Sequence, residues 1–318
     1  MIGRWFYYLL LIAREIGVKR VVLCLIYRLN VLEHSSDEWY WKLKTLMFAD
    51  EPYKLPGRGG GINSVIRWLQ MNWRSDLPTR CADKIAVREF VRDRIGEKYL
   101  IPQLPAEGVS WTDPGAIDFD ALPSAFVLKL NNGSGMNLIV RDKSALDKNE
   151  VRQKLGSWLK SEFSERIREY QYAGIKNQIY CEELLPWQNG KPPMDYKFMC
   201  TNGNPLFVWV DTDRFDDHQR GIYSTDWDRL DVSIMYKKAK CDVPRPPNLE
   251  EMLQVAGKLS EGIPLVRVDL YNIDGKIYFG EMTFTSDAGI GKVEPFAFSV
   301  EMAAKVDLGC FQVIQKDE

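Results

Sequence analysis

Residues 266–283 read VRVDLYNIDGKIYFGEMT, and this stretch is the strongest indicator of the fold. Two runs rich in apolar and β-branched residues flank Asp274-Gly275, a dipeptide typical of hairpin turns. We therefore predict a β-hairpin here. Because side chains alternate along a strand, Arg267 and Asp269 should share one face of the first strand.

The second strand of this hairpin carries Glu281 and Thr283 on one face. A two-residue turn would place them on the face opposite Asp269. A three-residue loop over Ile273 to Gly275, with the glycine in a left-handed bulge position, would bring the polar side chains together. Carboxylates that face each other across two strands repel by about 0.2–1 kcal/mol unless a cation lies between them. Oxygen ligands beside an arginine suit a nucleotide-bound Mg²⁺, so we predict a magnesium site; a solvated hairpin with scattered charges is the alternative.

A second pattern lies upstream and is typical of phosphate binding. The apolar run Phe126 to Leu130 contains Lys129, and the sequence NNGSG over residues 131–135 separates it from the apolar run Leu138 to Val140. This reads as strand, glycine loop, strand. Glycines let the backbone approach phosphate oxygens, and the lysine supplies a positive charge. The Walker pattern is absent, and a plain hairpin turn is the alternative.

A third pattern is the apolar run Ile179 to Leu185, which contains Glu182-Glu183. Such a strand end can offer backbone groups to an adenine and a carboxylate to ribose. The alternative is an edge strand with exposed acidic residues, which has the same sequence pattern. Further lysines stand at a predicted helix start, Lys84, and in a strand candidate, Lys197. Together with Lys129, these two lysines would either converge on one triphosphate or each stay solvated.

The remaining chain mixes helices and strands without a regular βαβ rhythm, which favours an α+β fold. A Pro/Gly break covers Pro52 to Gly61. We predict helices from Asp83 to Gly96, from a capping box at Ser144 through Leu159, and from Asn248 to Leu259. The further predicted strands are Tyr196 to Cys200 and Leu206 to Val210.

Composition excludes several classes of function. The 318 residues include 42 Lys and Arg against 44 Asp and Glu, so the net charge of -2 offers no electrostatic case for nucleic acid. Six cysteines lie far apart without a CxxC pair, which indicates reduced thiols and a cytoplasmic location. Only two histidines are present, which excludes most zinc hydrolase sites.

The first thirty residues carry two apolar runs, Trp5 to Ala13 and Val21 to Tyr27, with an excess of basic residues between and around them. Neither run reaches the roughly 20 residues that span a bilayer, and we find no signal-peptide cleavage site. An interfacial basic helix would give peripheral contact with a membrane or an assembly protein, and a pair of core helices is the alternative.

In chain order, the segments ADKIAVREFV (82–91), FVLKLNNGSG (126–135), DYKF (195–198) and RVDLYNIDGKIYFGEMTFT (267–285) resemble the TupA-like branch of the ATP-grasp superfamily. This branch is named for teichuronopeptide biosynthesis and occurs among genes for surface polysaccharides. The resemblance implies ATP and Mg²⁺ between two α+β lobes with a small glycine-loop lid, after an N-terminal helical segment. It implies four regions: residues 1–55, the N-terminal lobe 56–120, the lid 121–186 and the catalytic part 187–318.

The resemblance also implies roles for individual residues. The nucleotide would be held by Lys84, Lys129, Lys197, the loop residues Gly133, Ser134 and Gly135, and the hinge residues Glu182, Glu183, Leu184 and Leu185. Asp269, Glu281 and Thr283 would bind the metal, although many ATP-grasp enzymes have asparagine where this chain has Thr283. Arg267 would steady the transferred phosphoryl group. Arg214, His218 and Arg220 are candidates to hold an anionic substrate, with Arg214 close to the reaction.

The implied reaction is ATP-dependent ligation of a carboxylate and an amine through an acylphosphate, with small, sugar-linked substrates. Two alternatives stay open. Asp211-Thr212-Asp213 follows an apolar run and matches the DxD motif of metal-dependent glycosyltransferases. The second alternative is a non-catalytic ATP-grasp-like assembly protein.

Overall fold

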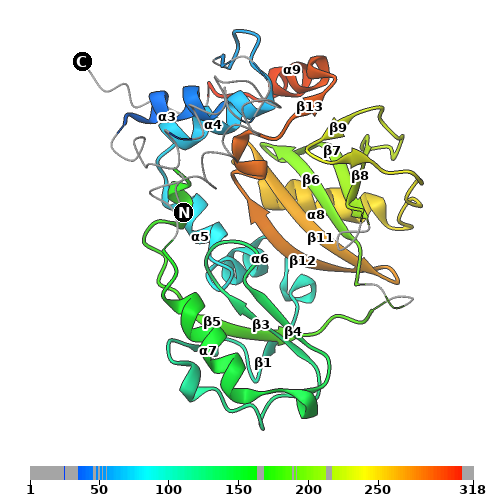
Figure 1. Ribbon diagram of the computed structural model, residues 1–318. Coiled ribbons are helices and arrows are strands. Elements are labelled where there is room, and N and C mark those ends of the chain that lie inside the picture. Colours follow the sequence, from blue (N-terminus) through cyan, green and yellow to red (C-terminus); the bar gives the residue numbers. More distant parts are fainter. Residues whose placement is uncertain are drawn as a thin grey trace, which may run out of the picture.

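The structure is a computed structural model that describes residues 35–45, 56–162, 168–187, 192–212 and 217–309, with residues 25, 48, 51, 53–54 and 190. It contains two main β-sheets with helices packed around them (Figure 1). The predicted α+β organisation is confirmed. Within these ranges no helix has the length and apolar character needed to cross a bilayer. The basic N-terminal segment, residues 1–30, lies outside the described residues apart from Leu25.

The larger sheet carries the predicted hairpin. Its strand order is β10-β8-β7-β6-β11-β12, and all neighbours are antiparallel except β10 and β8. The strands are β6 (Asp195–Thr201), β7 (Asn204–Thr212), β8 (Gln219–Tyr223), β10 (Lys237–Lys238), β11 (Val266–Ile273) and β12 (Lys276–Thr283). The strands predicted in β6, β7, β11 and β12 are confirmed, whereas β8 was not predicted. A separate small pair consists of β9 (Ser233–Ile234) and β13 (Val293–Glu294).

The register of the hairpin corrects our reasoning about its loop. Ile273 pairs with Lys276, so the turn has two residues, and both Asp274 and Gly275 have positive φ (50° and 83°). A β-bulge restores the face of the second strand, because Asp269 pairs with Glu281 while Leu270 pairs with Phe279. Gly280 is the extra residue. The expectation that only a three-residue loop brings the acids together was therefore wrong.

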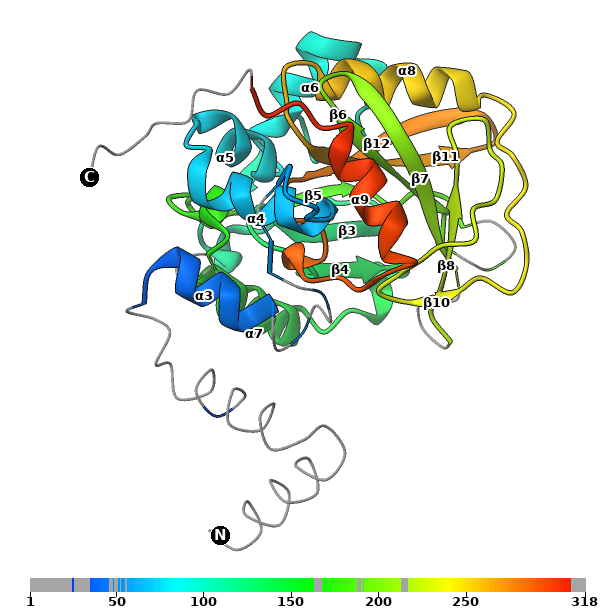
Figure 2. The same cartoon turned by 90° about the horizontal axis from the view of Figure 1, so that it is seen from above.

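Both faces of the larger sheet are covered, by different elements. Helix α8 (Leu249–Ser260) packs on one face over Phe198 and Val268, with α6 (Val87–Ile95) beside it. Helices α4 (Ile62–Asn72) and α9 (Phe296–Ala304) cover one end of the other face, as Figure 2 shows. Residues that alternate with the α8-facing core, among them Arg267 and Asp269, therefore lie on the second face.

The smaller sheet holds the glycine loop. Its order is β1-β5-β3-β4, and β2 also pairs with β5. The strands are β1 (Gln103–Leu104), β2 (Ser110–Trp111), β3 (Phe126–Leu130), β4 (Asn137–Val140) and β5 (Ile179–Glu183), which confirms the three predicted strands. Helix α7 (Lys148–Leu159) packs against it through Leu155 and Trp158. In Figure 1 this sheet lies below the larger one.

The remaining helices refine the predicted boundaries. Helix α6 begins at Val87, because Asp83 caps the preceding turn by accepting from the backbone N–H groups of Ile85 and Ala86. Gly96 ends it with φ 98°. The N-cap of α7 is Asp147 rather than Ser144. The other helices are α3 (Asp37–Lys44), α5 (Asp76–Ala82), η2 (Glu97–Tyr99), η3 (Pro114–Ala116), η4 (Lys143–Ala145), η5 (Tyr170–Tyr172) and η6 (Ser286–Gly289).

The division into four regions stays a prediction. Two observations bear on where the lid begins: β1 and β2, before residue 121, pair with β5, and Ile117 belongs to the core of the smaller sheet. The described cysteines Cys81, Cys181, Cys200 and Cys241 are free thiols.

Candidate active site

A buried cluster of charges stands on β6 and β11. Asp269 accepts two hydrogen bonds from Arg267, from Nε at 2.6 Å and Nη2 at 2.7 Å, and a third from Lys197 Nζ at 2.6 Å. Lys197 also donates to Asp195. The exposed fractions of Asp269 and Lys197 are only 2% and 4%, so these charges depend on one another for stabilisation.

The pKa values show which effect dominates in this cluster. Burial alone would raise the pKa of Asp269, but the charges of Arg267 and Lys197 hold it at about 2. Burial alone would likewise lower the pKa of Lys197, but the carboxylates of Asp195 and Asp269 raise it. Asp269 and Lys197 are therefore both charged at neutral pH.

Glu281 and Thr283 complete the cluster from β12. Arg267 Nη2 donates to Glu281 Oε1 at 2.8 Å, and the Thr283 hydroxyl donates to the same oxygen at 3.1 Å. One guanidinium thus contacts both Asp269 and Glu281, which shows that the bulge at Gly280 brings the two carboxylates within reach of a single cation. The side chain of Glu281 is 38% exposed, so one side of the cluster is open.

These residues fit a magnesium ion. The carboxylates of Asp195, Asp269 and Glu281 outnumber the cations Lys197 and Arg267 by one, so an added positive charge would be favourable. A carboxylate has about four lone-pair sites, and Asp269 uses three of them. Among the described residues no group of three or more His, Cys, Asp or Glu side chains forms a metal site by itself. A magnesium ion here would take further ligands from phosphate and water.

Of the predicted phosphate lysines, Lys197 belongs to this cluster, Lys129 lies on β3 of the smaller sheet and Lys84 lies in the turn before α6. Lys129 on β3 pairs with Glu182 on β5 at 2.5 Å, and Arg88 on α6 contacts the same carboxylate at 3.3 Å. Lys84 donates to the backbone carbonyl of Gly133 at 2.5 Å, which joins the start of α6 to the glycine loop.

The pKa of Lys84 reflects the charges around it. Burial lowers that pKa most strongly; the charge of Glu281 then raises it and the charge of Lys129 lowers it further. Lys84 is thus within electrostatic range of the hairpin and of the strand lysine at once. Lys84, in the turn before α6, and Lys197 on β6 therefore both lie within electrostatic range of Glu281.

The loop and hinge residues have the backbone freedom and exposure that ligand contact needs. Gly133 and Gly135 have positive φ of 72° and 75°, and Ser134 between them is exposed. Glu182 is buried beside Lys129, whereas Glu183 is exposed. Leu184 and Leu185 are half-buried directly after β5.

The predicted substrate anchors lie differently from expectation. Arg214 is outside the described residues. Arg220 lies on β8 rather than in a loop; it is buried and donates to Asp211 through Nε at 2.6 Å and Nη2 at 3.2 Å. His218 Nε2 lies 3.3 Å from the same carboxylate. Asp211 of the DxD triplet is therefore held by Arg220, and Asp213 lies outside the described residues.

Sequence reasoning missed two members of the charged networks. Asp195 pairs with Lys197, and strand alternation places two such residues on one face, so the pattern DYK contained that signal. Arg88 joins Glu182 to Glu107, and only its position one helical turn after Lys84 indicated a shared face.

The family model described as TupA-like ATPgrasp matches residues 64–303. No curated protein matches the sequence.

Solved structures that resemble the chain include the D-alanine–D-alanine ligase from Bacillus anthracis complexed with ATP. Their sequences are 16% identical, the match covers 70% of this chain and 59% of that one, and the TM-score is 0.37. The corresponding ligase from Helicobacter pylori is 15% identical over 79% and 70%, with a TM-score of 0.39. The ATP-grasp ligase PsnB, complexed with a phosphomimetic variant of its minimal precursor, Mg and ADP, is 13% identical over 76% and 64%, with a TM-score of 0.40.

Proposed function

Because the chain belongs to the TupA-like ATP-grasp family, we propose that it is an ADP-forming ligase that joins a carboxylate to an amine. One observation supports the proposal: Arg267 contacts both Asp269 and Glu281, and Lys84, which donates to the glycine loop after Lys129, lies within electrostatic range of Glu281. Such a set of charges suits a nucleotide triphosphate and its metal. The chain covers only 59% of the length of the first solved structure named above, and the activity is proposed from its own residues.

In the first step, an oxygen of the substrate carboxylate attacks the γ-phosphorus of ATP. A carboxylate–phosphorus bond forms, the bond from γ-phosphorus to the β,γ-bridging oxygen breaks, and ADP leaves. In the second step, the amine nitrogen attacks the acyl carbon, phosphate leaves with its bonding electrons, and the nitrogen loses a proton. Neither step needs a nucleophile from the protein.

The protein contributes position and charge. Lys84, Lys129 and Lys197 would hold phosphate oxygens, and the loop over Gly133 to Gly135 would cover them. Arg267 would neutralise charge on the transferred phosphoryl group. Asp269 and Glu281, with Thr283 orienting Glu281, would hold Mg²⁺, which when bound neutralises phosphate charge.

We further propose that the reaction serves surface polysaccharide biosynthesis in the cytoplasm, with a uronic acid or other sugar-linked carboxylate and an amino acid or amino sugar as substrates. The resemblance to a branch named for teichuronopeptide biosynthesis supports this assignment. Contact of residues 1–30 with a membrane or an assembly protein stays a prediction.

The test is ADP release by the purified chain across a panel of amino acids and amino sugars, each with uronic acids or sugar nucleotides. The proposal requires ADP release that depends on both an amine and a carboxylate. UDP release from a sugar nucleotide without ATP would support a glycosyltransferase instead. Absence of Mg-ATP binding in calorimetry would support the non-catalytic alternative.

A further inference from the structure

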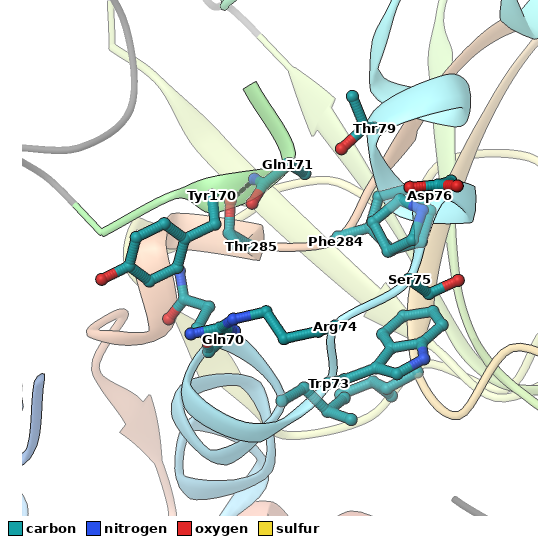
Figure 3. A pocket seen from close by; sticks show the side chains of 13 residues that line it. Gln70, Trp73, Arg74, Ser75, Asp76, Thr79, Tyr170, Gln171, Phe284 and Thr285 are labelled. Atoms are coloured by element: carbon teal, nitrogen blue, oxygen red, sulfur yellow. Dashed lines mark hydrogen bonds between the residues drawn. The ribbon is translucent and has the colours of Figure 1, made fainter. Parts of the chain in front are cut away.

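A cavity of about 610 Å³ lies beside the candidate active site, between α4, α5, the η5 turn and the segment that follows β12 (Figure 3). Its size is in the usual range for small-molecule sites. Thr285 lines it and is only four residues beyond Glu281, about 13 Å along an extended chain. Gln171, also in the lining, donates to the Thr285 hydroxyl at 2.8 Å. The lining at Thr285 is therefore at most about 13 Å from Glu281, a span that a small substrate can cover.

The lining carries one charge of each sign. Arg74 is its one cation and Asp76 its one anion, and the two side chains lie on opposite sides of the opening in Figure 3. The Arg74 guanidinium lies over the ring of Tyr170 at 4.5 Å and donates to the backbone carbonyl of Gln70 at 2.6 Å, which fixes its direction. Its Nη2 also lies 3.7 Å from Oδ2 of Asp37, which is outside the lining, and its side chain is 47% exposed, so a ligand carboxylate reaches the guanidinium from the open side. A zwitterion matches this lining better than a polyanion or a neutral sugar.

Gln70 is the second, independent indication of a ligand. It is 7% exposed and lines the cavity beside Arg74, as Figure 3 shows. Within the described part of the chain, neither its Nε2 nor its Oε1 has a hydrogen-bond partner. A buried amide without partners destabilises the fold, and an ordered water or a bound ligand is the usual partner of such a group in native structures.

We propose that this cavity binds the amine substrate and that this substrate is an amino acid. The assignment rests on the proposed ligase function, which requires an amine nucleophile next to the acylphosphate. Arg74 pairs with the substrate's own carboxylate and keeps it away from the phosphoryl group. Asp76 balances the ammonium charge, and the Gln70 amide, whose two polar atoms are enclosed in the free protein, turns toward the ligand to donate and accept one hydrogen bond each. The amino group then lies toward Thr285 and the metal carboxylates.

The test is calorimetric titration of the full chain, with Mg²⁺ and a non-hydrolysable ATP analogue present, by each of the twenty common L-amino acids and by D-glucuronate. At least one amino acid should bind. Arg74→Ala should weaken its binding about tenfold or more, because a charge-assisted hydrogen bond is lost. The α-amide of the same amino acid should bind the unaltered protein equally weakly. Arg80→Ala, in an exposed pair with Glu89 outside the lining, is the matched control and should bind normally.

Gln70→Leu separates a ligand-binding role from a structural one. Leucine has nearly the same shape and removes two unpartnered polar atoms, so we expect weaker amino-acid binding together with a melting temperature raised by about 2–4 °C. A lower melting temperature would show that the amide stabilises the fold, and would overturn its assignment to a ligand.

Two further results would overturn the proposal while leaving the ligase function in place. One is normal amino-acid binding by both variants, and the other is binding of D-glucuronate but of no amino acid, each with the nucleotide analogue still bound. Failure of the nucleotide analogue to bind would instead remove the proposed function, and the assignment of the cavity with it.

Discussion

Asp269→Asn and Glu281→Gln should both abolish ligation but should differ in their effect on stability. Each removes one of the two carboxylates proposed to hold magnesium while keeping the side chain's shape. Asp269 is buried between Arg267 and Lys197, whereas Glu281 is 38% exposed. The pair of variants therefore separates loss of the metal site from loss of the fold.

The magnitudes follow from the contacts. Asparagine at 269 leaves two buried cations without their shared anion and replaces three charge-assisted hydrogen bonds from Arg267 and Lys197. Breaking a buried ion pair from one side costs about 3–5 kcal/mol; the Asn carbonyl still accepts one bond, so we expect about 3 kcal/mol of lost unfolding free energy. Glu281 loses one partly exposed ion pair with Arg267, which contributes about 0.2–1 kcal/mol.

Urea unfolding followed by circular dichroism measures the stability difference, and ADP release with calorimetric Mg-ATP titration measures function. Asp120→Asn, at an exposed carboxylate paired with Lys148, controls for substitution of an acid and should change neither. Equal stability of Asp269→Asn and the unaltered protein would refute the account of the buried cluster. Undiminished turnover of Glu281→Gln would refute the metal assignment.

Three further results are expected. Gly280→Ala should lower stability by about 1 kcal/mol and weaken Mg-ATP binding, because the added Cβ would lie 3.0 Å from the Asp269 carbonyl oxygen; an unchanged urea midpoint would contradict this. The pKa of Asp269 is about 2 in the folded state, below the roughly 3.9 of an unfolded chain, so its stabilisation is complete above pH 4 and is lost as pH falls toward 2. Urea midpoints between pH 5 and 3 should fall less in Asp269→Asn than in the unaltered protein. Lys84→Met should weaken Mg-ATP binding about tenfold in calorimetry, whereas Lys148→Met on α7 should not.

The strands could be predicted because each pattern is local. Alternation located the hairpin, and the glycine loop after Lys129 identified β3 and β4. The register of the hairpin could not be predicted by alternation, because that rule assumes that every residue of one strand pairs with one residue of the other. Gly280 inside a strand was the available signal, since glycine there often marks a bulge.

The cavity could not have been predicted from local patterns. Gln70 and Arg74 lie on or next to α4, almost one hundred residues before Tyr170 and more than two hundred before Thr285. No spacing rule connects such positions, and only the packing of α4 and α5 against the larger sheet brings them together. The substrate arginines proposed from the sequence after β7 had a local rationale, but Arg220 is already engaged by Asp211.

The bulge at Gly280 makes the number of residues between Asp269 and Glu281 as important as their identity. Deleting one residue, or inserting one, would rotate the glutamate from the open side of the sheet into the apolar layer under α8, with the composition of the hairpin almost unchanged. In related chains, insertions or deletions between these two positions should therefore comprise an even number of residues. A difference of an odd number of residues would identify a chain in which the counterpart of Glu281 has been lost or lies at another position.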